Sequence, residues 1–382
     1  LRALLPDSRS VLGIELDSLL ALGRINPDDA SAPLGLTPLG IRLSRATNGV
    51  SRRHGEVARR MWNDLFPERR VEDVPVGHVT NGVHLPTWMG GPMRALLDAH
   101  LGDRWTERTG DPHLGALIDA IPDDQVWQAR CAARAALVQH LRDRSIVERL
   151  RRGEPAGYAE SAAEVFDAQR LTVGFARRVA TYKRLHLLTA DMEAAQRILG
   201  GNGAPRLQLV VAGKAHPMDD EAKRLVQGLF RFKDAAEFRG AVIFLEDYDL
   251  GTAARLVSGC DLWVNLPRPP LEASGTSGMK AALNGAINLG TLDGWWAEAW
   301  DGSDGWALPE HAGLDPYSED ASDAGALYSL LENEVIPLFE ERDAEGVPRG
   351  WVRMVKASLR TAIRDYTATR MLDDYVARVY RR

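Results

Sequence analysis

Leu171-Thr172-Val173-Gly174-Phe175 opens the part of the chain that decides the fold, because from here short apolar runs alternate regularly with helical stretches. The other apolar runs have the length of strands and lie at residues 207–212, 242–245, 262–265 and 287–289. Helical periodicity marks the segments between them, at residues 185–199, 221–230 and 252–257. Strand, loop and helix in repeated order predict an α/β fold, with a parallel sheet covered by helices on both faces.

Most of the chemically suggestive stretches in this region directly follow a predicted strand. In parallel sheets of this kind, ligands bind outside the carboxyl ends of the strands. We therefore expect these stretches to gather on one rim of the sheet.

The first such stretch is basic and holds Arg177, Arg178, Lys183 and Arg184. It follows the strand at 171–175 and runs into a helix expected to start near Thr181. Arginine offers a planar fork of donors and lysine a compact charge, so the cluster could neutralise more than one phosphate. The alternative is a basic surface turn, but the position of the cluster directly after a strand favours anion binding.

The second stretch reads Leu271-Glu272-Ala273-Ser274-Gly275-Thr276-Ser277-Gly278-Met279-Lys280 and leads into a helix-forming segment. Glycines and hydroxyl residues before a helix expose backbone N–H groups that suit an anion, which Glu272 and Lys280 would bracket. The alternative is a loop capped by Thr276 or Ser277, with Lys280 solvated on the helix surface.

Three weaker stretches are Lys214 to His216, the acidic run 246–249, and the turn at 80–88. Lys214 and His216 are more simply structural. The acidic run could hold a metal, but no histidine or further carboxylate stands at metal-ligand spacing, so ligand hydrogen bonding and loop structure stay equally open.

Composition narrows the classes of protein. The chain has 382 residues, enough for two domains, and its net charge of −6 argues against bulk binding of nucleic acid or acidic membranes. Cys131 and Cys260 are the only cysteines, which fits a reducing cytoplasm without disulfides. No apolar run approaches the roughly 18 residues of a membrane span, and nothing at the start is typical of a signal peptide.

The remainder of the chain is less regular. The sequence of residues 1–80 does not predict a complete domain. Helices are expected at 10–22 and 55–65, but strands and helices do not alternate there. A long helix is expected from Asp123, with its arginines on a solvated surface. The chain opens without methionine, which suggests a piece of something longer.

Two motifs are missing from the sequence. There is no Gly-x-Ser-x-Gly nucleophile elbow and no Gly-x-Gly-x-x-Gly after a strand. A serine hydrolase and a dinucleotide site are therefore unsupported.

Taken with residues 46–55 and Leu292-Asp293-Gly294-Trp295-Trp296, these stretches resemble the α-glucan (glycogen, starch, maltodextrin) phosphorylases, in their bacterial branch. The run from Glu272 to Lys280 is the most specific part of the resemblance. The resemblance implies a GT-B-type glycosyltransferase architecture. Residues 1–80 would be the tail of the N-terminal catalytic domain, and residues 81–382 the C-terminal Rossmann-like cofactor-binding domain with terminal helices.

The resemblance also implies roles for single residues. Lys280 would form a Schiff base with pyridoxal 5′-phosphate, and Arg177 would lie near the cofactor phosphate. Arg178 and Lys183 would bind the substrate phosphate, and Glu272 a sugar hydroxyl. Further cofactor contacts are implied at Thr276, Ser277, Trp88 and Tyr248, and further substrate contacts at Asn81, Tyr182, Ser274 and Gly275.

The implied reaction is phosphorolysis of an α-1,4-glucan or maltodextrin by inorganic phosphate, which gives α-D-glucose 1-phosphate with retention. The cofactor phosphate relays a proton, so the carboxylate pair of ordinary glycosidases is not required. The resemblance also implies a cytoplasmic protein that can form a homodimer, with no nucleic-acid or membrane partner and no metal.

Two alternatives stay open. A nucleotide-sugar glucosyltransferase of the glycogen-synthase kind shares the architecture, but it has no reason to place a lysine at position 280. The second alternative is an inactive fragment that binds cofactor or glucan, because most of the family's amino-terminal half is missing from this chain.

Overall fold

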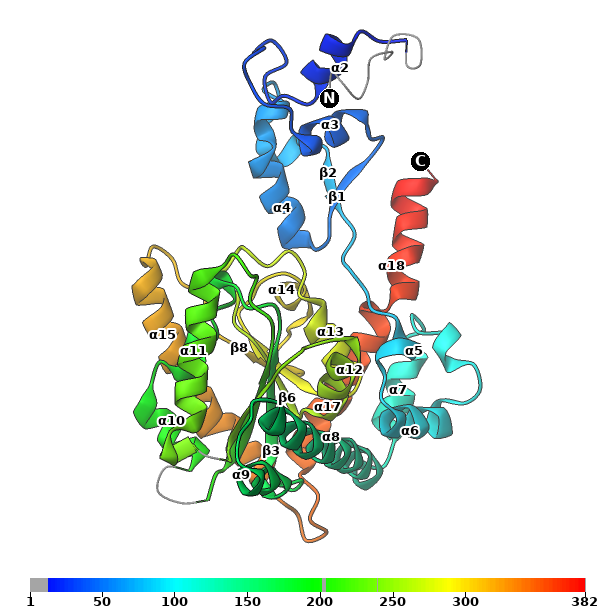
Figure 1. Ribbon diagram of the computed structural model, residues 1–382. Coiled ribbons are helices and arrows are strands. Elements are labelled where there is room, and N and C mark those ends of the chain that lie inside the picture. The colour runs from blue at the N-terminus through cyan, green and yellow to red at the C-terminus, as the bar shows by residue number, and fades with distance from the viewer. Residues whose placement is uncertain (1–12, 201–203, 239, 382) are drawn as a thin grey trace. The chain divides into compact units, whose positions relative to one another are not determined.

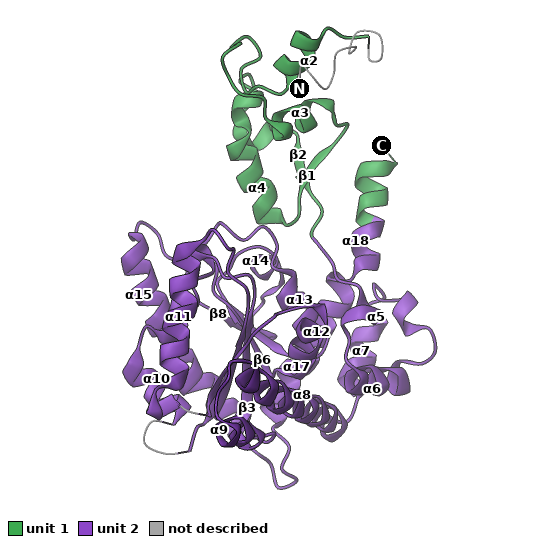
Figure 2. Cartoon of the chain, in the orientation of Figure 1, with its two compact units in different colours: residues 1–80, 374–382 green, residues 81–373 purple. Residues whose placement is uncertain are grey.

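The computed structural model describes residues 13–200, 204–238 and 240–381, which fall into two compact units (Figure 2). Residues 1–80 and 374–382 form the first unit, and residues 81–373 the second. The end of the chain joins the first unit because Asn48 Nδ2 donates to the Tyr375 hydroxyl at 3.1 Å and Arg45 donates to the Tyr380 carbonyl at 3.3 Å. The expected domains, 1–80 and 81–382, differ from these units in the placement of residues 374–382, and they stay a proposal.

The first unit contains strands as well as helices. Strands β1 (Thr47–Gly49) and β2 (Val76–His78) pair in parallel, and α4 (Arg52–Met61) lies between them in the sequence. The prediction that strands and helices do not alternate here was therefore wrong, since three-residue strands are too short to show a period. The helix expected at 55–65 corresponds to α4 and η1. The one expected at 10–22 begins at Leu16, with residues 10–12 outside the described chain. The other elements of this unit are α2 (Leu16–Leu22), α3 (Leu36–Leu43), η1 (Asn63–Leu65), η2 (Val71–Asp73) and η9 (Val376–Tyr380).

The second unit is built on a six-stranded, all-parallel sheet in the order β5-β4-β3-β6-β7-β8. Strands β3, β6 and β8 of this sheet are labelled in Figure 1, with helices around them. The five predicted strands are confirmed, and a short sixth strand was missed. Because β3 and β6 are neighbours, the direction in which successive strands are added reverses between them. The strands are β3 (Leu171–Ala176), β4 (Leu207–Ala212), β5 (Val242–Leu245), β6 (Leu262–Asn265), β7 (Ile287–Gly290) and β8 (Gly305–Ala307).

Both faces of this sheet are buried under helices, as the alternation along β4 shows. Leu207, Leu209 and Val211 join the larger apolar cluster, with side chains of α10 and α11. Val210 and Ala212 join a second cluster, with side chains of α8 and α12. Side chains alternate between the two faces of a strand, so two covered faces favour a run that is almost entirely apolar. The one polar side chain of β4, Gln208, is buried and donates to the Asp167 carbonyl at 2.9 Å and to the Thr172 hydroxyl at 2.8 Å.

The helices expected at 221–230 and 252–257 are confirmed as α11 and α12, whereas the one expected at 185–199 is divided into the 3-10 turn η6 and the helix α10. None of the helices of the second unit, in the described segments, is long and apolar enough to cross a bilayer. Their bounds are α5 (Leu85–Trp88), α6 (Gly91–Leu101), η3 (Trp105–Glu107), α7 (His113–Ala120), α8 (Asp123–Arg151), α9 (Ala156–Glu160), η4 (Ser161–Glu164), η5 (Thr181–Lys183), η6 (Leu185–Thr189), α10 (Met192–Leu199), α11 (Asp220–Asp234), η7 (Ala236–Phe238), α12 (Leu250–Gly259), α13 (Thr276–Ala282), α14 (Trp296–Ala299), α15 (Pro316–Leu330), η8 (Leu331–Val335), α16 (Ile336–Glu340) and α17 (Arg349–Asp365). The helix α18 (Ala368–Tyr375) begins in the second unit and ends in the first.

The long helix α8 is confirmed, but two of its arginines do not lie on a solvated surface. Arg130 and Arg134 are fully buried and both bond Asp261, at 3.4 and 2.7 Å. Arg130 also donates to the carbonyls of Ser258 and Asn284, at 2.8 Å each. The prediction was wrong because the carboxylate lies far along the sequence, directly before β6.

Asp304, directly before β8, gives the stability of the fold a dependence on pH. Burial raises the pKa of its carboxyl from 3.8 to about 6, against an opposing hydrogen bond from Thr361. An acid whose pKa is higher in the folded state stabilises the fold at low pH, and this stabilisation is lost as the pH rises from about 4 to about 6.

We therefore expect Asp304→Asn to be more stable than the parent near neutral pH. A shift of this size corresponds to about 1–2 kcal/mol in the free energy of unfolding, after allowance for partial solvation. Urea titrations should show the difference near pH 7.5 and not near pH 4. A difference that is the same at both pH values would contradict this account of Asp304.

Candidate active site at the sheet rim

Two loops meet at the carboxyl ends of β3 and β6, where the strand order reverses. In doubly wound sheets this is the place where ligands bind. The loops are bonded to each other, since the backbone N–H of Arg268 donates to the carbonyl of Tyr182 at 2.7 Å. The prediction that chemically suggestive stretches gather on one rim is confirmed for this pair.

The centre of the site is the carboxylate of Glu272. Its Oε2 atom accepts from Arg177 Nη2 at 2.7 Å and forms a second ion pair with the ammonium of Lys183. Lys183 also lies over the ring of Tyr182, at 4.5 Å from the centroid. Both recorded contacts use Oε2, so within the described residues Oε1 keeps its capacity to accept.

Arg177 is buried with two of its three nitrogens unsatisfied. Only 9% of the residue is exposed, and Nε and Nη1 have no hydrogen-bond partner among the described residues. Burial lowers the pKa of the guanidinium, and Glu272 opposes that shift. Because an arginine stays charged in proteins, these orphaned donors favour a further anion beside Glu272.

Arg178 and Arg184 have different environments. Arg178 is exposed and, within the described chain, has no ion-pair partner. Arg184 is fully buried against α15, with Nη1 at 2.7 Å from Asp323 and 3.1 Å from Asp320. Arg184 was wrongly counted among the cations available to a ligand.

Arg184 instead fixes the two loops to each other. Its Nε donates to the carbonyl of Leu266 at 2.9 Å, in the loop after β6. Its backbone is left-handed, with φ of 52°, which ends the turn η5 after Lys183. The helix predicted to start near Thr181 is therefore a single turn.

Lys280 lies in the last turn of the short helix α13. Gly275 takes the N-cap position with φ of +84°, and neither Thr276 nor Ser277 caps the helix through its side chain. The Ser277 hydroxyl accepts from Trp263 Nε1 at 3.2 Å and donates to Asn265 at 3.3 Å. The alternative of a hydroxyl-capped loop is therefore wrong.

Lys280 is half-buried rather than solvated on the surface. Its Nζ lies 3.6 Å from the centroid of the Trp88 ring, and within the described residues it has no ion-pair partner. Burial lowers the pKa of the Lys280 ammonium. A lysine that loses its proton more readily is a better nucleophile.

The segment 292–296 is hydrogen-bonded to the loop that carries Glu272 and Ser274, a role that the sequence did not predict. Asp293 Oδ2 accepts from the backbone N–H of Glu272, and Ser274 O accepts from the backbone N–H of Trp295, both at 2.8 Å. At Gly294 a Cβ would lie 2.4 Å from the Ser274 carbonyl, so only glycine fits. The Ser274 hydroxyl is itself buried and, within the described residues, has no partner.

The weaker stretches contribute less. Asp249 caps α12 by accepting from the backbone N–H of Thr252 at 2.7 Å, which supports loop structure there. Burial raises the pKa of Tyr248, and the charge of Arg177 opposes this shift. Lys214 is exposed and lies 3.7 Å from Asp247. For Asn81, the contact that the structure shows is from Arg370 Nη2 to its carbonyl, at 3.0 Å.

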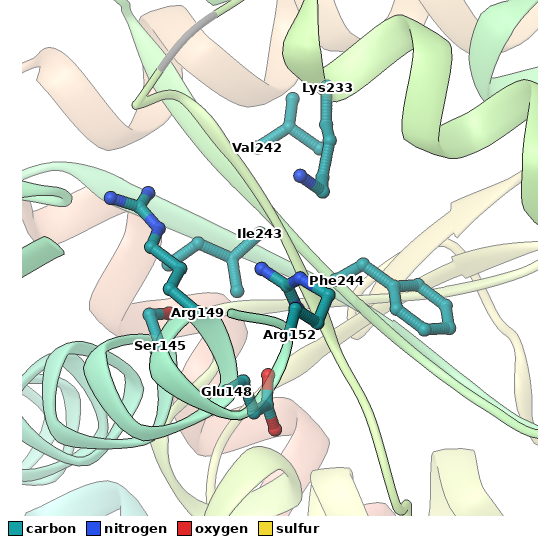
Figure 3. Close-up of a pocket in the computed structure, with 8 residues that line it drawn as sticks. All are labelled: Ser145, Glu148, Arg149, Arg152, Lys233, Val242, Ile243 and Phe244. Carbon is teal, nitrogen blue, oxygen red and sulfur yellow. The ribbon is translucent and has the colours of Figure 1, made fainter. Parts of the chain in front are cut away.

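A separate pocket lies against β5 and the last turns of α8 and α11 (Figure 3). Three cations line it, but each has a partner: Arg149 donates to the Tyr158 carbonyl, Arg152 bonds Glu154 at 2.6 Å, and Lys233 pairs with Asp234. Its residues come from the strand and the helices rather than from the loops at the rim. The pocket is therefore not part of the candidate site.

Fold and site together define a class of protein: a doubly wound α/β domain with two cations paired to one carboxylate at its rim, and a half-buried lysine on the helix α13 that follows the same loop. The family model described as carbohydrate phosphorylase matches residues 23–301. The chain belongs to the carbohydrate phosphorylase family.

Three relatives show how far the similarity extends. The glycogen phosphorylase of Aquifex aeolicus is 40% identical over 97% of this chain and 53% of its own length. The glycogen phosphorylase of Mycobacterium bovis is 42% identical over 98% of this chain and 42% of its own length. The maltodextrin phosphorylase of Thermococcus litoralis is 37% identical over 96% of this chain and 42% of its own length. The chain thus spans about half the length of the curated relatives it matches.

Proposed function

We propose that this chain is part of an α-1,4-glucan phosphorylase. Such an enzyme releases the terminal glucose of a glucan or maltodextrin as α-D-glucose 1-phosphate, with retention of configuration. The observation that carries the proposal is the convergence of Arg177, Lys183 and Glu272 at the rim, near a motif that ends on the half-buried Lys280.

The residues present fit pyridoxal 5′-phosphate, the cofactor we propose. Lys280 offers an amine whose pKa burial has lowered, and Trp88 offers a flat apolar ring beside it. Arg177 and Ser274 hold buried polar atoms that lack partners within the described chain, which suits a phosphate. Thr276, Ser277 and Tyr248 are proposed as further contacts. When bound, the cofactor would supply its phosphate group as the source of the proton delivered to the leaving oxygen.

The chain's own residues would then hold the two phosphates and the sugar. Two anions approach each other only where fixed cations offset their repulsion. Arg177 and Lys183 supply such charge in a buried setting, and exposed Arg178 supplies it where inorganic phosphate would enter.

The sugar would be bound by the opposite side of the same cluster. Arg177 and Lys183 fix Glu272 through Oε2, so that Oε1 can accept from a sugar hydroxyl. Ser274, Gly275, Tyr182 and Asn81 are proposed as further sugar contacts. In the reaction the bond from C1 to the glycosidic oxygen breaks, an oxygen of inorganic phosphate bonds C1, and the glycosidic oxygen gains a proton.

We propose a GT-B architecture for the whole enzyme. Residues 1–80 would be the tail of its N-terminal catalytic domain, and residues 81–382 its cofactor-binding domain. A cytoplasmic location and a homodimer stay predictions.

The test is a donor and product assay with the 382-residue chain supplied with pyridoxal 5′-phosphate. With maltodextrin and inorganic phosphate, ³¹P NMR should show α-D-glucose 1-phosphate. Transfer of glucose from a nucleotide sugar, without this product, would favour the glucosyltransferase alternative. Cofactor and glucan binding without turnover would favour the binding-fragment alternative.

A further inference from the structure

Asn284 lies two residues past the end of α13 and is fully buried. The motif that carries Lys280 continues to this asparagine, but the proposed function assigns no role to the side chain of Asn284. A buried amide needs partners for both of its donors and for its oxygen. The identity of those partners indicates what Asn284 does.

The amide of Asn284 joins the lysine helix to a distant segment of the chain. Its Nδ2 donates to the carbonyl of Lys280 and to the carbonyl of Trp88, at 2.8 Å each. Its Oδ1 accepts from the backbone N–H of Gly90 at 2.6 Å. One side chain therefore bonds the backbone of Lys280 and of the residue whose ring lies against the Lys280 ammonium.

The backbone around this amide is closely packed, so the link is rigid. Arg130 Nη1 donates to the Asn284 carbonyl at 2.8 Å. At Gly285, with φ of +73°, a Cβ would lie 2.7 Å from a methyl group of Val355, and at Gly90 a Cβ would lie 2.7 Å from the Cβ of Ser258. The glycines on both sides of this link leave no space for a larger residue, and the three bonds of the Asn284 amide join the backbone of the 88–90 segment to that of Lys280.

The Trp88 ring acts on Lys280 in two opposite ways. A ring face 3.6 Å from Nζ attracts a cation, which favours the protonated amine. The same ring helps to exclude water, which disfavours it. Burial lowers the pKa of Lys280. We expect the loss of hydration to outweigh the attraction of the ring.

We propose that Asn284 is a positioning residue: it holds the Trp88 ring against the Lys280 ammonium and so sets the reactivity of that lysine toward an aldehyde on an aromatic cofactor. The proposal rests on the proposed function for the identity of the aldehyde. The contact between Asn284, Trp88 and Lys280 does not depend on it.

The test measures the reactivity of Lys280 in the cofactor-free 382-residue chain by trace acetylation with acetic anhydride over a range of pH. Peptide mass spectrometry reports Lys280 relative to the exposed Lys223. In Asn284→Ala and Asn284→Asp, Lys280 should regain water and its labelling midpoint should move to higher pH. Labelling near pH 8 should fall about threefold or more, because one pKa unit changes the neutral fraction about tenfold.

The matched control is Asn288→Ala. Asn288 is also buried and donates to the backbone of α13, at Gly278 O, but it is not bonded to the 88–90 segment. The Lys280 midpoint should be unchanged in this variant. Trp88→Ala should shift the midpoint as Asn284→Ala does, and combining the two should add nothing further.

Several results would overturn the proposal. An unchanged Lys280 midpoint in folded Asn284→Ala or Asn284→Asp would show that the amide does not set its reactivity. Loss of folding in both variants would show that Asn284 serves the fold itself. Failure of the proposed function would be seen in a different experiment: Lys280 of the parent chain would carry no pyridoxyl group after incubation with pyridoxal 5′-phosphate and reduction with borohydride. The acetylation profiles would still decide the role of Asn284.

Discussion

Lys280→Ala is expected to abolish the retention of pyridoxal 5′-phosphate that we propose for this chain and, with it, the proposed formation of glucose 1-phosphate. The Lys280 ammonium is half-buried over Trp88 and has no ion-pair partner among the described residues, so the fold does not depend on its charge. The variant should keep the circular dichroism spectrum and unfolding midpoint of the parent. Cofactor content, measured by absorbance after gel filtration, should fall from near-stoichiometric to background.

The control for this prediction is Lys214→Ala. Lys214 also follows a strand of the same sheet, but it is exposed and pairs only loosely with Asp247, at 3.7 Å. It should keep the cofactor content of the parent. Equal loss in both variants would indicate non-specific attachment of the aldehyde to lysines and would contradict the role given to Lys280.

Asp261→Ala is expected to have the largest effect on stability. Asp261 is fully buried and is the shared carboxylate of Arg130 and Arg134, which are buried as well. Its Oδ2 also accepts from the backbone N–H of Thr172 at 3.0 Å. Removing one partner of a buried ionic cluster leaves charge uncompensated, so the free energy of unfolding should fall by about 3–5 kcal/mol.

Guanidinium chloride titrations of Asp261→Ala and Asp261→Asn would measure this effect. Asparagine keeps an acceptor for Thr172 but loses the charge, so that variant should lie between the parent and Asp261→Ala. Glu107→Ala breaks the exposed ion pair with Arg104 and should leave the transition midpoint unchanged. A similar midpoint for Asp261→Ala and Glu107→Ala would contradict the structural role assigned to Asp261.

The central sheet could be predicted from the sequence because each buried strand is short, apolar and bounded by turn residues. The place of the site could also be predicted, since Arg177, Lys183 and Glu272 each follow a strand and parallel strands end at a common rim. The three-residue strands β1, β2 and β8 could not, because three residues carry no readable period.

The charged partners could not be predicted from local pattern. Arg130, Arg134 and Arg184 are typical of solvated or ligand-binding arginines until the fold brings Asp261 and the acidic face of α15 against them. The pairing of Glu272 with both cations, and the amide of Asn284 between Trp88 and Lys280, likewise join residues far apart in the sequence. Their signal is tertiary and is absent from any short window.

The most direct test of the central claim is borohydride reduction of the chain with bound pyridoxal 5′-phosphate, followed by peptide mass spectrometry. The structure predicts a single dominant pyridoxyl group, on Lys280. A folded, cofactor-supplemented sample in which Lys280 is unlabelled, or is labelled no more than exposed lysines such as Lys214 and Lys223, would contradict the claim that this rim is a phosphorylase cofactor site.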